Sequence, residues 1–189
     1  MKIRLLLPVA LALLCCACVT NIRPDVAGNP PPAEPFSQFQ HYMLAPMKVS
    51  SEAAHETAAV DKISTYMQQR VGGTLAGWEN RNQSGRVLNI EPTIVQLKFV
   101  SGGARFFAGA LAGSSAVLMR VKFTDAQTGR VIADPEFYQR AAAYGGAWSI
   151  GGTDNGMLAR IATVVQQYLQ NNDARAVGGP TGLDGTERK

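Results

Sequence analysis

Apolar residues in the middle of the chain recur at spacings of three or four, which is typical of a helix with one buried face. The first such run predicts a long helix beginning near Ser50 or Ser51, either of which can cap it. Gly72 and Gly73 interrupt the run, yet the apolar spacing continues past them. We therefore expect the helix to continue and another backbone to pack closely against the glycines. The apolar residues of this helix are Val60, Ile63, Met67, Val71, Leu75 and Trp78.

A second run of the same kind predicts a helix that begins at Thr153 or Asp154. Its apolar residues are Leu158, Ile161, Val165, Tyr168 and Leu169. Alternating or short apolar runs predict four strands in the rest of this region. Their sequences are "FQHYMLAPM", "RVLNIEPTIVQLKFV", "SAVLMRVKFTD" and "RVIADPEFYQRAAA". In the third strand the inward positions are Val117, Met119, Val121 and Phe123.

Two features of the strands carry finer predictions. In the second strand, strict alternation would place Leu88 and Ile90 on one face and the later apolar residues, including Val95, on the other. A bulge near Pro92 would turn both sets toward one core. The turn "DAQTGR" joins the third and fourth strands, with Asp125 holding it through its side chain and Gly129 supplying a positive φ.

The predicted order of elements is βαβββα. It corresponds to an α+β fold of two layers, with about four strands in one mixed sheet and both helices on one face. If the first two strands are parallel through a right-handed crossover and the others follow as hairpins, the second and fourth strands end at the same end of the sheet. Two loops then meet there.

The N-terminal residues 1–17 have the parts of a signal peptide for export. Lys2 and Arg4 form a basic start, about ten apolar residues follow, and Ala17 is a small residue at the end. The apolar run is too short to span a bilayer, which needs roughly 20 such residues. We therefore expect a cleaved signal rather than a membrane helix.

The motif "CCAC" resembles the lipobox of bacterial lipoproteins, in which the last cysteine is acylated and the peptide is cut just before it. The resemblance implies lipid attachment at Cys18, although Cys15 stands where leucine is usual. Two or three acyl chains such as palmitate would anchor the chain firmly. Val19, in place of an inner-membrane retention Asp, favours the outer membrane, facing the periplasm. The alternative is an ordinary signal peptide with cysteines as small apolar residues.

Composition divides the rest of the chain into three parts. Residues 18–37 are proline-rich and predict a flexible linker after the lipid, residues 38–171 predict one α/β globular domain, and residues 172–189 predict a disordered tail. An extended linker would reach on the order of 50 Å, at about 3.1 Å per residue, and hold the domain away from the membrane.

Charge and cysteine content exclude several classes of function. The whole chain has 18 Lys and Arg residues, and removal of the signal takes away Lys2 and Arg4. The remaining 16 basic residues nearly balance the 14 acidic ones and are scattered along the chain. No nucleic-acid partner is therefore expected. The mature chain has no cysteine besides the acylated one, which excludes thiol redox chemistry and a cysteine metal site.

The segment from residue 87 to residue 137 resembles a family of bacterial envelope lipoproteins, the domain of unknown function 4410. The resemblance is carried, in order, by "IEP" before a strand, a glycine-rich loop with Arg105, an apolar strand and the hairpin "DAQTGRVI". The last helix extends the resemblance, which then covers about 80 residues. It implies an envelope location and an α/β fold, with no catalytic residue to carry over.

No arrangement of residues predicts catalysis, a metal or a cofactor. His55 is flanked by Glu52 and Glu56, a mixture typical of a solvated helix start, and His41 is interpreted as a structural residue within a strand. Asp125 is explained by its turn. The chain is therefore predicted not to be an enzyme. The alternative, a periplasmic hydrolase, would need a buried polar cleft around one of these residues.

The two loops predicted to meet at one sheet end combine glycine with aromatic residues. They are "SGGARFFAGALAGSS" and "YGGAWSIGG", and the candidate partner-binding residues in them are Arg105, Phe106, Phe107, Tyr144 and Trp148. The alternative is that their aromatic side chains plug the end of the core. Because the linker enters at the opposite end of the sheet, the loops are expected to point away from the lipid.

These observations favour a non-catalytic binding or assembly module of the bacterial envelope, anchored in a membrane by its N-terminal lipid. The expected partner is an envelope protein or a glycan. A self-associating structural lipoprotein is a further alternative, since the sequence does not give the oligomeric state.

Overall fold

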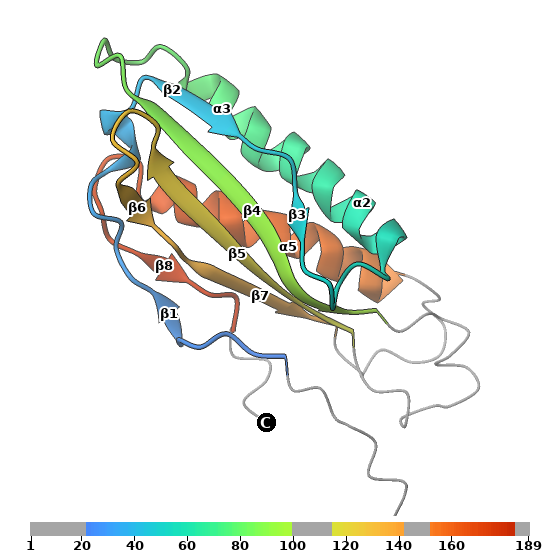
Figure 1. The fold of residues 1–189 in the computed structure, drawn as a ribbon. Helices are drawn as coiled ribbons and strands as arrows, with labels where there is room; N and C mark the ends of the chain where they lie inside the picture. Colours follow the sequence, from blue (N-terminus) through green and yellow to red (C-terminus); the bar gives the residue numbers. More distant parts are fainter. Residues whose placement is uncertain (1–21, 100–114, 142–151, 184–189) are drawn as a thin grey trace, which may run out of the picture.

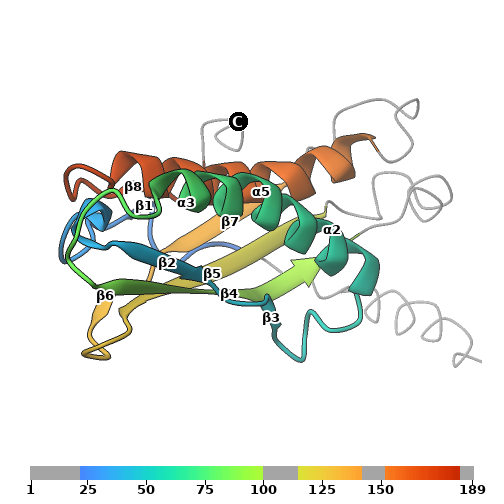
Figure 2. The same ribbon diagram turned by 90° about the horizontal axis from the view of Figure 1, so that it is seen from above.

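Two helical stretches cover one face of a mixed β-sheet in the structure, a computed structural model that describes residues 22–99, 115–141 and 152–183 (Figures 1 and 2). The first stretch is continuous and consists of α2 (Thr57–Met67), the π-helical η3 (Gln68–Gly72) and α3 (Gly73–Trp78). The second is α5 (Gly152–Asn171). The predicted α+β fold, with two helices on one face of a mixed sheet, is confirmed.

The main sheet has β4 (Val87–Lys98) and β5 (Ala116–Asp125) at its centre, and these two strands are antiparallel. Along the outer side of β4 run β2 (His41–Leu44) and β3 (Lys48–Val49), both parallel to β4. Along the outer side of β5 run β6 (Val131–Ala133) and β7 (Glu136–Arg140), both antiparallel to β5. The predicted fourth strand is therefore present in two pieces, and the first is followed by a further short edge strand, β3, just beyond its predicted end.

Prolines divide the edge strands because they have no N–H to donate to a ladder. Pro46 lies between β2 and β3, and Pro135 lies between β6 and β7. Pro92 sits inside β4 without a bulge, opposite Val121, whose N–H donates to the carbonyl of Pro135 instead (3.1 Å).

The predicted bulge in β4 is real but lies at Val95, where the register shifts between Ile94 and Gln96. The extra residue keeps Ile94 and Leu97 on the helix-covered face of the sheet. Val95 turns to the other face, so the prediction that it joins the same core is wrong.

The core between sheet and helices is built from the predicted apolar stripes. All the inward positions of β5 and the apolar residues of α5 are buried, as are four of the first helix, Ile63, Met67, Val71 and Leu75. The start of that helix was predicted too early. It begins at Thr57, and Ser50 instead donates to the carbonyl of Val95 and accepts the N–H of Ala53.

The helix does continue through Gly72 and Gly73, but no backbone packs against them. A Cβ on Gly73 would meet nothing within 4 Å, and one on Gly72 would come within 3.2 Å only of the Gln68 side chain. Gly72 ends the π-helical turn and Gly73 follows it, so the glycines lie where the helix widens and not where another backbone approaches.

The prediction of a flexible linker at residues 18–37 is wrong for its described part, residues 22–37. Phe36 in the short 3₁₀ turn η2 (Phe36–Gln38) is fully buried and stacks on Phe123 with 5.0 Å between ring centroids. Its N–H donates to the carbonyl of Asn172 (3.0 Å). Proline and glycine did not prevent packing because one large aromatic residue enters the core and the extended backbone follows the sheet edge.

The prediction of a disordered tail is likewise wrong for residues 172–183. β8 (Gly179–Pro180) pairs with β1 (Gly28–Asn29) in a small antiparallel sheet. Both ends of the described chain thus lie beside β7 (Figure 1). Asn172 is fully buried and bonds the backbone of residues 177 and 178.

The chain ends close the outer edge of β7 by replacing a neighbouring strand. The Asn29 amide donates to the carbonyl of Glu136 (2.7 Å) and accepts its N–H (2.9 Å), while the N–H of Tyr138 donates to the carbonyl of Thr181 (2.7 Å). Edge strands left open invite pairing with other chains. Here the chain itself occupies those backbone groups.

Gly182 should be irreplaceable at this edge. Its φ is +91°, and a Cβ there would lie 2.2 Å from the carbonyl oxygen of Tyr138. Gly182→Ala is expected to lower the free energy of unfolding by more than the roughly 1–2 kcal/mol that a left-handed residue costs alone. The matched control is Gly73→Ala, which should raise it by about 0.5–1 kcal/mol. Urea unfolding of both variants measures the difference, and equal effects would contradict the close approach.

Candidate functional site

The predicted site residues lie outside the part of the chain that the structure describes. They are Cys18, Arg105, Phe106, Phe107, Tyr144 and Trp148. Their roles therefore stay predictions. The points where their segments attach are described: Lys98 at the end of β4 and Arg140 at the end of β7 both pair with Ala116. The two segments leave the sheet from one end, as the topology predicted.

A second apolar cluster covers the sheet near that end, on the face away from the helices. We call it the open-face cluster; its buried members are Ile22, Ala116, Leu118 and Tyr138. Val95, turned outward by the bulge, and Leu183 pack against it. Ile22 is 5% exposed, so the first described residue of the chain is already fixed to the domain.

The N-terminal segment runs back along the sheet rather than away from it. It enters β2 near the hairpin end of the sheet, where the N–H of His41 bonds the carbonyl of Arg86, and the backbone N–H of Ala33 bonds Ile132 (2.8 Å). In chain order, the segment starts at the open-face cluster, runs along β7 and then β6, and reaches the hairpin end just before β2 (Figure 1). The linker therefore does enter the sheet at the end opposite the loops, as predicted, but its first described residue, Ile22, lies near the loop end. The expectation that the loops point away from the lipid concerns residues outside the described part and stays a prediction.

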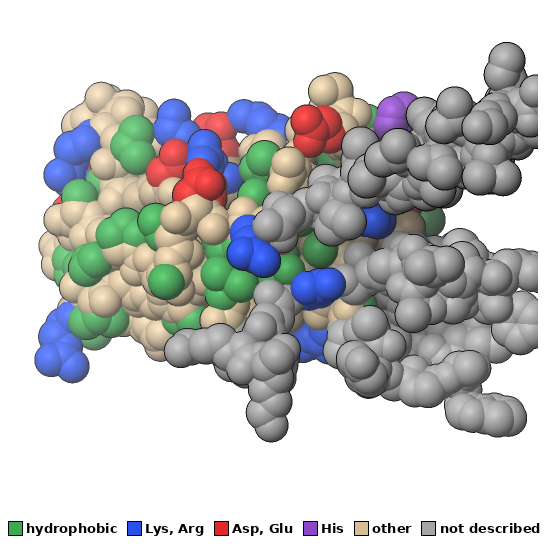
Figure 3. Space-filling view, turned by 90° about the horizontal axis from the view of Figure 1, so that it is seen from below, with side chains coloured by type: hydrophobic (Ala, Val, Ile, Leu, Met, Phe, Trp, Pro, Cys, Tyr) green, Lys and Arg blue, Asp and Glu red, His purple; other side chains and the backbone are tan. Residues whose placement is uncertain are grey.

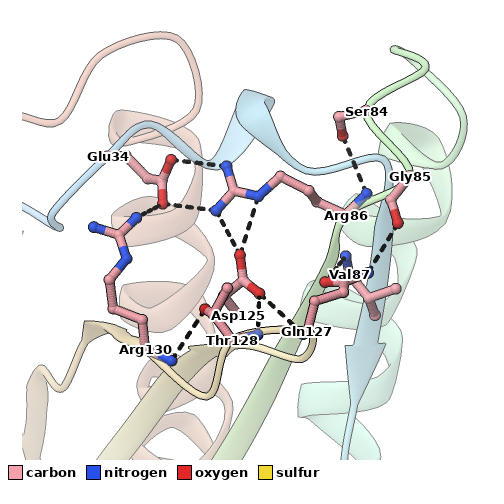
Figure 4. Close-up of polar contacts among 9 residues, drawn as sticks. All are labelled: Glu34, Ser84, Gly85, Arg86, Val87, Asp125, Gln127, Thr128 and Arg130. Carbon is pink, nitrogen blue, oxygen red and sulfur yellow. Dashed lines mark hydrogen bonds and ion pairs between the residues drawn. The ribbon is translucent and has the colours of Figure 1, made fainter.

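A charged cluster fixes the same segment at the hairpin end (Figure 4). The guanidinium of Arg86 lies between two carboxylates, 2.8 and 2.9 Å from the Glu34 oxygens and 2.6 and 3.0 Å from Asp125 Oδ2. Arg130 also binds Glu34, and the Arg86 guanidinium lies 4.2 Å over the Phe39 ring. We call these residues, Glu34, Arg86, Asp125 and Arg130, the Arg86 cluster.

The carboxylates of the Arg86 cluster are held in the charged form. The hydrogen bond from Arg86, with backbone N–H groups of the turn, lowers the pKa of Asp125 to about 2 from its ordinary 3.8. The hydrogen bond from Arg86 likewise lowers the pKa of Glu34. Asp125 also holds its turn as predicted, accepting the N–H groups of Gln127 and Thr128 (both 2.9 Å), and Gly129 has φ +69°.

The histidines take part in no shared arrangement with Asp125. His41 Nδ1 lies 2.9 Å from Glu79, whose other oxygen accepts the N–H of Tyr42 (2.8 Å). His55 is exposed. The buried carboxylate of Asp125 is bonded by Arg86, so Asp125 and His41 each have a charged partner other than one another. The prediction that the chain is not an enzyme stays a prediction.

Within residues 22–99, 115–141 and 152–183, no three His, Cys, Asp or Glu side chains gather where a metal ion could be held. No helix of that same part is both long enough and apolar enough to cross a bilayer.

Neither a family model nor a curated protein matches the chain. Several solved structures are similar at low identity. The PelC dodecamer from Paraburkholderia phytofirmans is 10% identical, with 72% of this chain and 93% of that chain covered and a TM-score of 0.35. A Xanthomonas campestris protein of family model DUF330 is 12% identical, covering 80% and 95%, with a TM-score of 0.45. A Caulobacter crescentus protein named as a lipoprotein is 12% identical, covering 73% and 92%, with a TM-score of 0.36. Membership of the domain of unknown function 4410 family stays a prediction.

Sequence reasoning missed the residues that position the N-terminal segment. Ile22 and Phe36 are isolated apolar residues in a proline-rich stretch, and this isolation was the available signal. Glu34 and Arg86 stand 52 positions apart, one in the proline-rich stretch and one at the start of a strand, and nothing in the sequence pairs them.

Replacing Arg86 should weaken the fold and change its response to acid. Arg86→Met leaves Asp125 buried without its cation, so the melting temperature at pH 7 should fall by several degrees. A lowered carboxyl pKa stabilises the fold above pH 4 and loses that effect as the pH falls toward 2, so the variant should show a smaller loss over that range. Melting curves at pH 7, 4 and 2.5 measure this.

The control for this prediction is Lys48→Ala. It removes an exposed pair with Glu91 (2.7 Å) and should change the melting temperature little. If both variants behave alike, the Arg86 cluster does not fix the segment.

Proposed function

We propose that the chain is a lipoprotein of the bacterial cell envelope, acylated at Cys18, whose folded domain is a non-catalytic module for binding or assembly. The motif "CCAC" after a short apolar run carries the proposal. Outer-membrane residence facing the periplasm is part of the proposal and is favoured by Val19.

The contacts of the described charged residues favour binding over catalysis. Glu34, Glu79, Asp125 and Glu136 each accept hydrogen bonds that hold two segments together. Side-chain hydrogen bonds lower the pKa of Glu34, Glu79 and Asp125, which favours their charged form and makes them poorer proton donors. The chemistry of these groups is structural.

The acylation is tested with Cys18→Ser in the producing cell. The native protein should lack residues 1–17, carry fatty acyl chains on Cys18 and sediment with membranes, whereas the variant should lose the acyl chains and appear in the soluble fraction. Mass spectrometry of the N-terminal peptide and fractionation measure both. An unmodified Cys18, or an intact Met1, in the native product would overturn the proposal.

Partner binding is tested at the predicted loop residues. Phe106→Ala, Phe107→Ala and Trp148→Ala should each reduce recovery of a cross-linked envelope protein or glycan several-fold, because aromatic residues at an interface centre carry much of the binding energy. Their melting temperatures should stay within a few degrees of the parent protein. Val131→Ala, at an exposed apolar residue of β6 near the other sheet end, is the control and should change neither quantity. A large loss of melting temperature with unchanged recovery would favour the core-plug alternative.

A further inference from the structure

The face of the main sheet that the helices leave uncovered is arranged in rows of side chains, and we call it the open face. Figure 1 looks onto it, with α5 passing behind the sheet. Alternation along each strand brings the outward side chains of neighbouring strands side by side in register. The row nearer the β5–β6 hairpin consists of Met43, Asn89, Thr124 and Val131. The row nearer the middle consists of Lys48, Thr93, Arg120 and Glu136.

Apolar side chains are exposed at both ends of the row nearer the hairpin. Met43 of β2 is 60% exposed and Val131 of β6 is 46% exposed. Their neighbours Tyr42 and Ile132 belong to the core between sheet and helices, so Met43 and Val131 point the other way. Large apolar residues exposed to this extent number only four in residues 22–99, 115–141 and 152–183. Two of the four therefore lie on one row, at opposite edges of the sheet.

Charged side chains of both signs share the rows beside it, three basic and three acidic. They are Lys48, Arg120, Lys122, Glu91, Asp134 and Glu136. Figure 3 views the domain from the edge where β1 and β8 lie, and basic and acidic side chains gather together along its upper margin, which is the open face seen edge-on. Since neither sign is in excess, this part of the face favours neither an anionic nor a cationic partner.

The open face is complementary to itself when two copies meet sheet against sheet. A twofold axis that is parallel to the strands and lies between β4 and β5 keeps each row opposite itself and exchanges its two ends. Met43 then faces Val131 of the second copy, so the exposed apolar residues meet. In the middle row the uncharged Thr93 faces Arg120, so two cations are not brought together. Packed sheets keep their strands within about 30° of one another, which this axis satisfies.

The charged residues match under the same axis. Glu91 and Lys122 are paired across β4 and β5, so Glu91 of each copy faces Lys122 of the other. Lys48, at one end of its row, faces Glu136 at the other end, where the exposed Asp134 also lies. Opposite charges therefore meet at each of these positions, which fixes the register of the contact.

The contact ends where the open-face cluster begins. Ile22 and Leu183 pack on the sheet there and keep a second sheet from approaching to the usual separation of about 10 Å. Lys98 and Arg140, in the last row, therefore stay outside the contact. The remaining face is about 20 Å wide, at roughly 4.8 Å per strand, and buries less than a standard interface. A weak dimer is therefore expected.

We infer that the part of the open face between the hairpin and the open-face cluster binds a second copy of this chain, sheet against sheet, about this axis. The alternative for a sheet covered on one side is a face that meets only water. Both copies keep Ile22 at the same end, so two chains anchored in one membrane can form the contact. The inference does not depend on acylation at Cys18.

The geometry of the contact is tested by cross-linking at single cysteines. The chain from residue 18 onward contains every described residue and, with Cys18→Ser, no thiol. Met43→Cys and Val131→Cys are introduced separately, and the two variants are mixed with a thiol cross-linker of about 10 Å, the separation of packed sheets. The mixture should give several-fold more dimer than either variant alone, because equal positions of the two copies lie on opposite edges, about 14 Å apart across the sheet.

Chance collisions give cross-links at any exposed cysteine, so a control position is needed. Gln167→Cys, at an exposed position of α5, should give no dimer above that background with either variant. Equal yields from the mixture and from the single variants, or yields no higher than those with Gln167→Cys, would overturn the inference.

The charges give a second test, measured as dimer affinity by sedimentation equilibrium of the same chain. Lys122→Glu opposes Glu91 of the second copy with a like charge and should raise the dimer dissociation constant about tenfold or more. Adding Glu91→Lys exchanges the two signs and should restore the constant to within about threefold of the parent value. Melting temperatures should change by no more than a few degrees, since the pair lies at the surface. A parent chain that is monomeric at every concentration, or a double variant that dimerises no better than Lys122→Glu, contradicts the contact.

Discussion

The arrangement of the domain depends on how the outer edge of β7 is satisfied. The Asn29 side chain bonds both backbone groups of Glu136, and Thr181 receives the N–H of Tyr138. These bonds hold the N-terminal segment and the C-terminal segment against the sheet. They keep Ile22, the first described residue, on the open-face cluster.

The core could be predicted because its information is local. The stripe from Leu158 to Leu169 and the alternation from Val117 to Phe123 each follow one period, and burial of one face stabilises each element as its period predicts. A bulge in β4 was predicted correctly, but it was placed at Pro92 because a proline cannot donate to the strand ladder. Pro92 needs none, because Val121 opposite it bonds Pro135, so the extra residue could be accommodated at Val95.

The rest could not be predicted because it depends on contacts between distant residues. Phe36 reaches Phe123, and Glu34 reaches Arg86, through stretches whose composition is that of a linker. Proline-rich chains lose little entropy when they pack in an extended form, so a single buried ring and a few side-chain bonds can hold one. For the candidate site, topology predicted that both loops leave the sheet from the same end. The burial of Ile22 near that end could not be predicted from the sequence.

The pairing of β1 with β8 joins residues about 150 positions apart and has a consequence for biogenesis. A chain that is still being synthesised has its N-terminal segment but not its last strand, so the N–H of Tyr138 on β7 lacks its partner until residue 181 has been made. Until then the nascent chain exposes a template for mispairing with other strands. Covering the edge of β7 is therefore a late event in the folding of a chain made from its N-terminus.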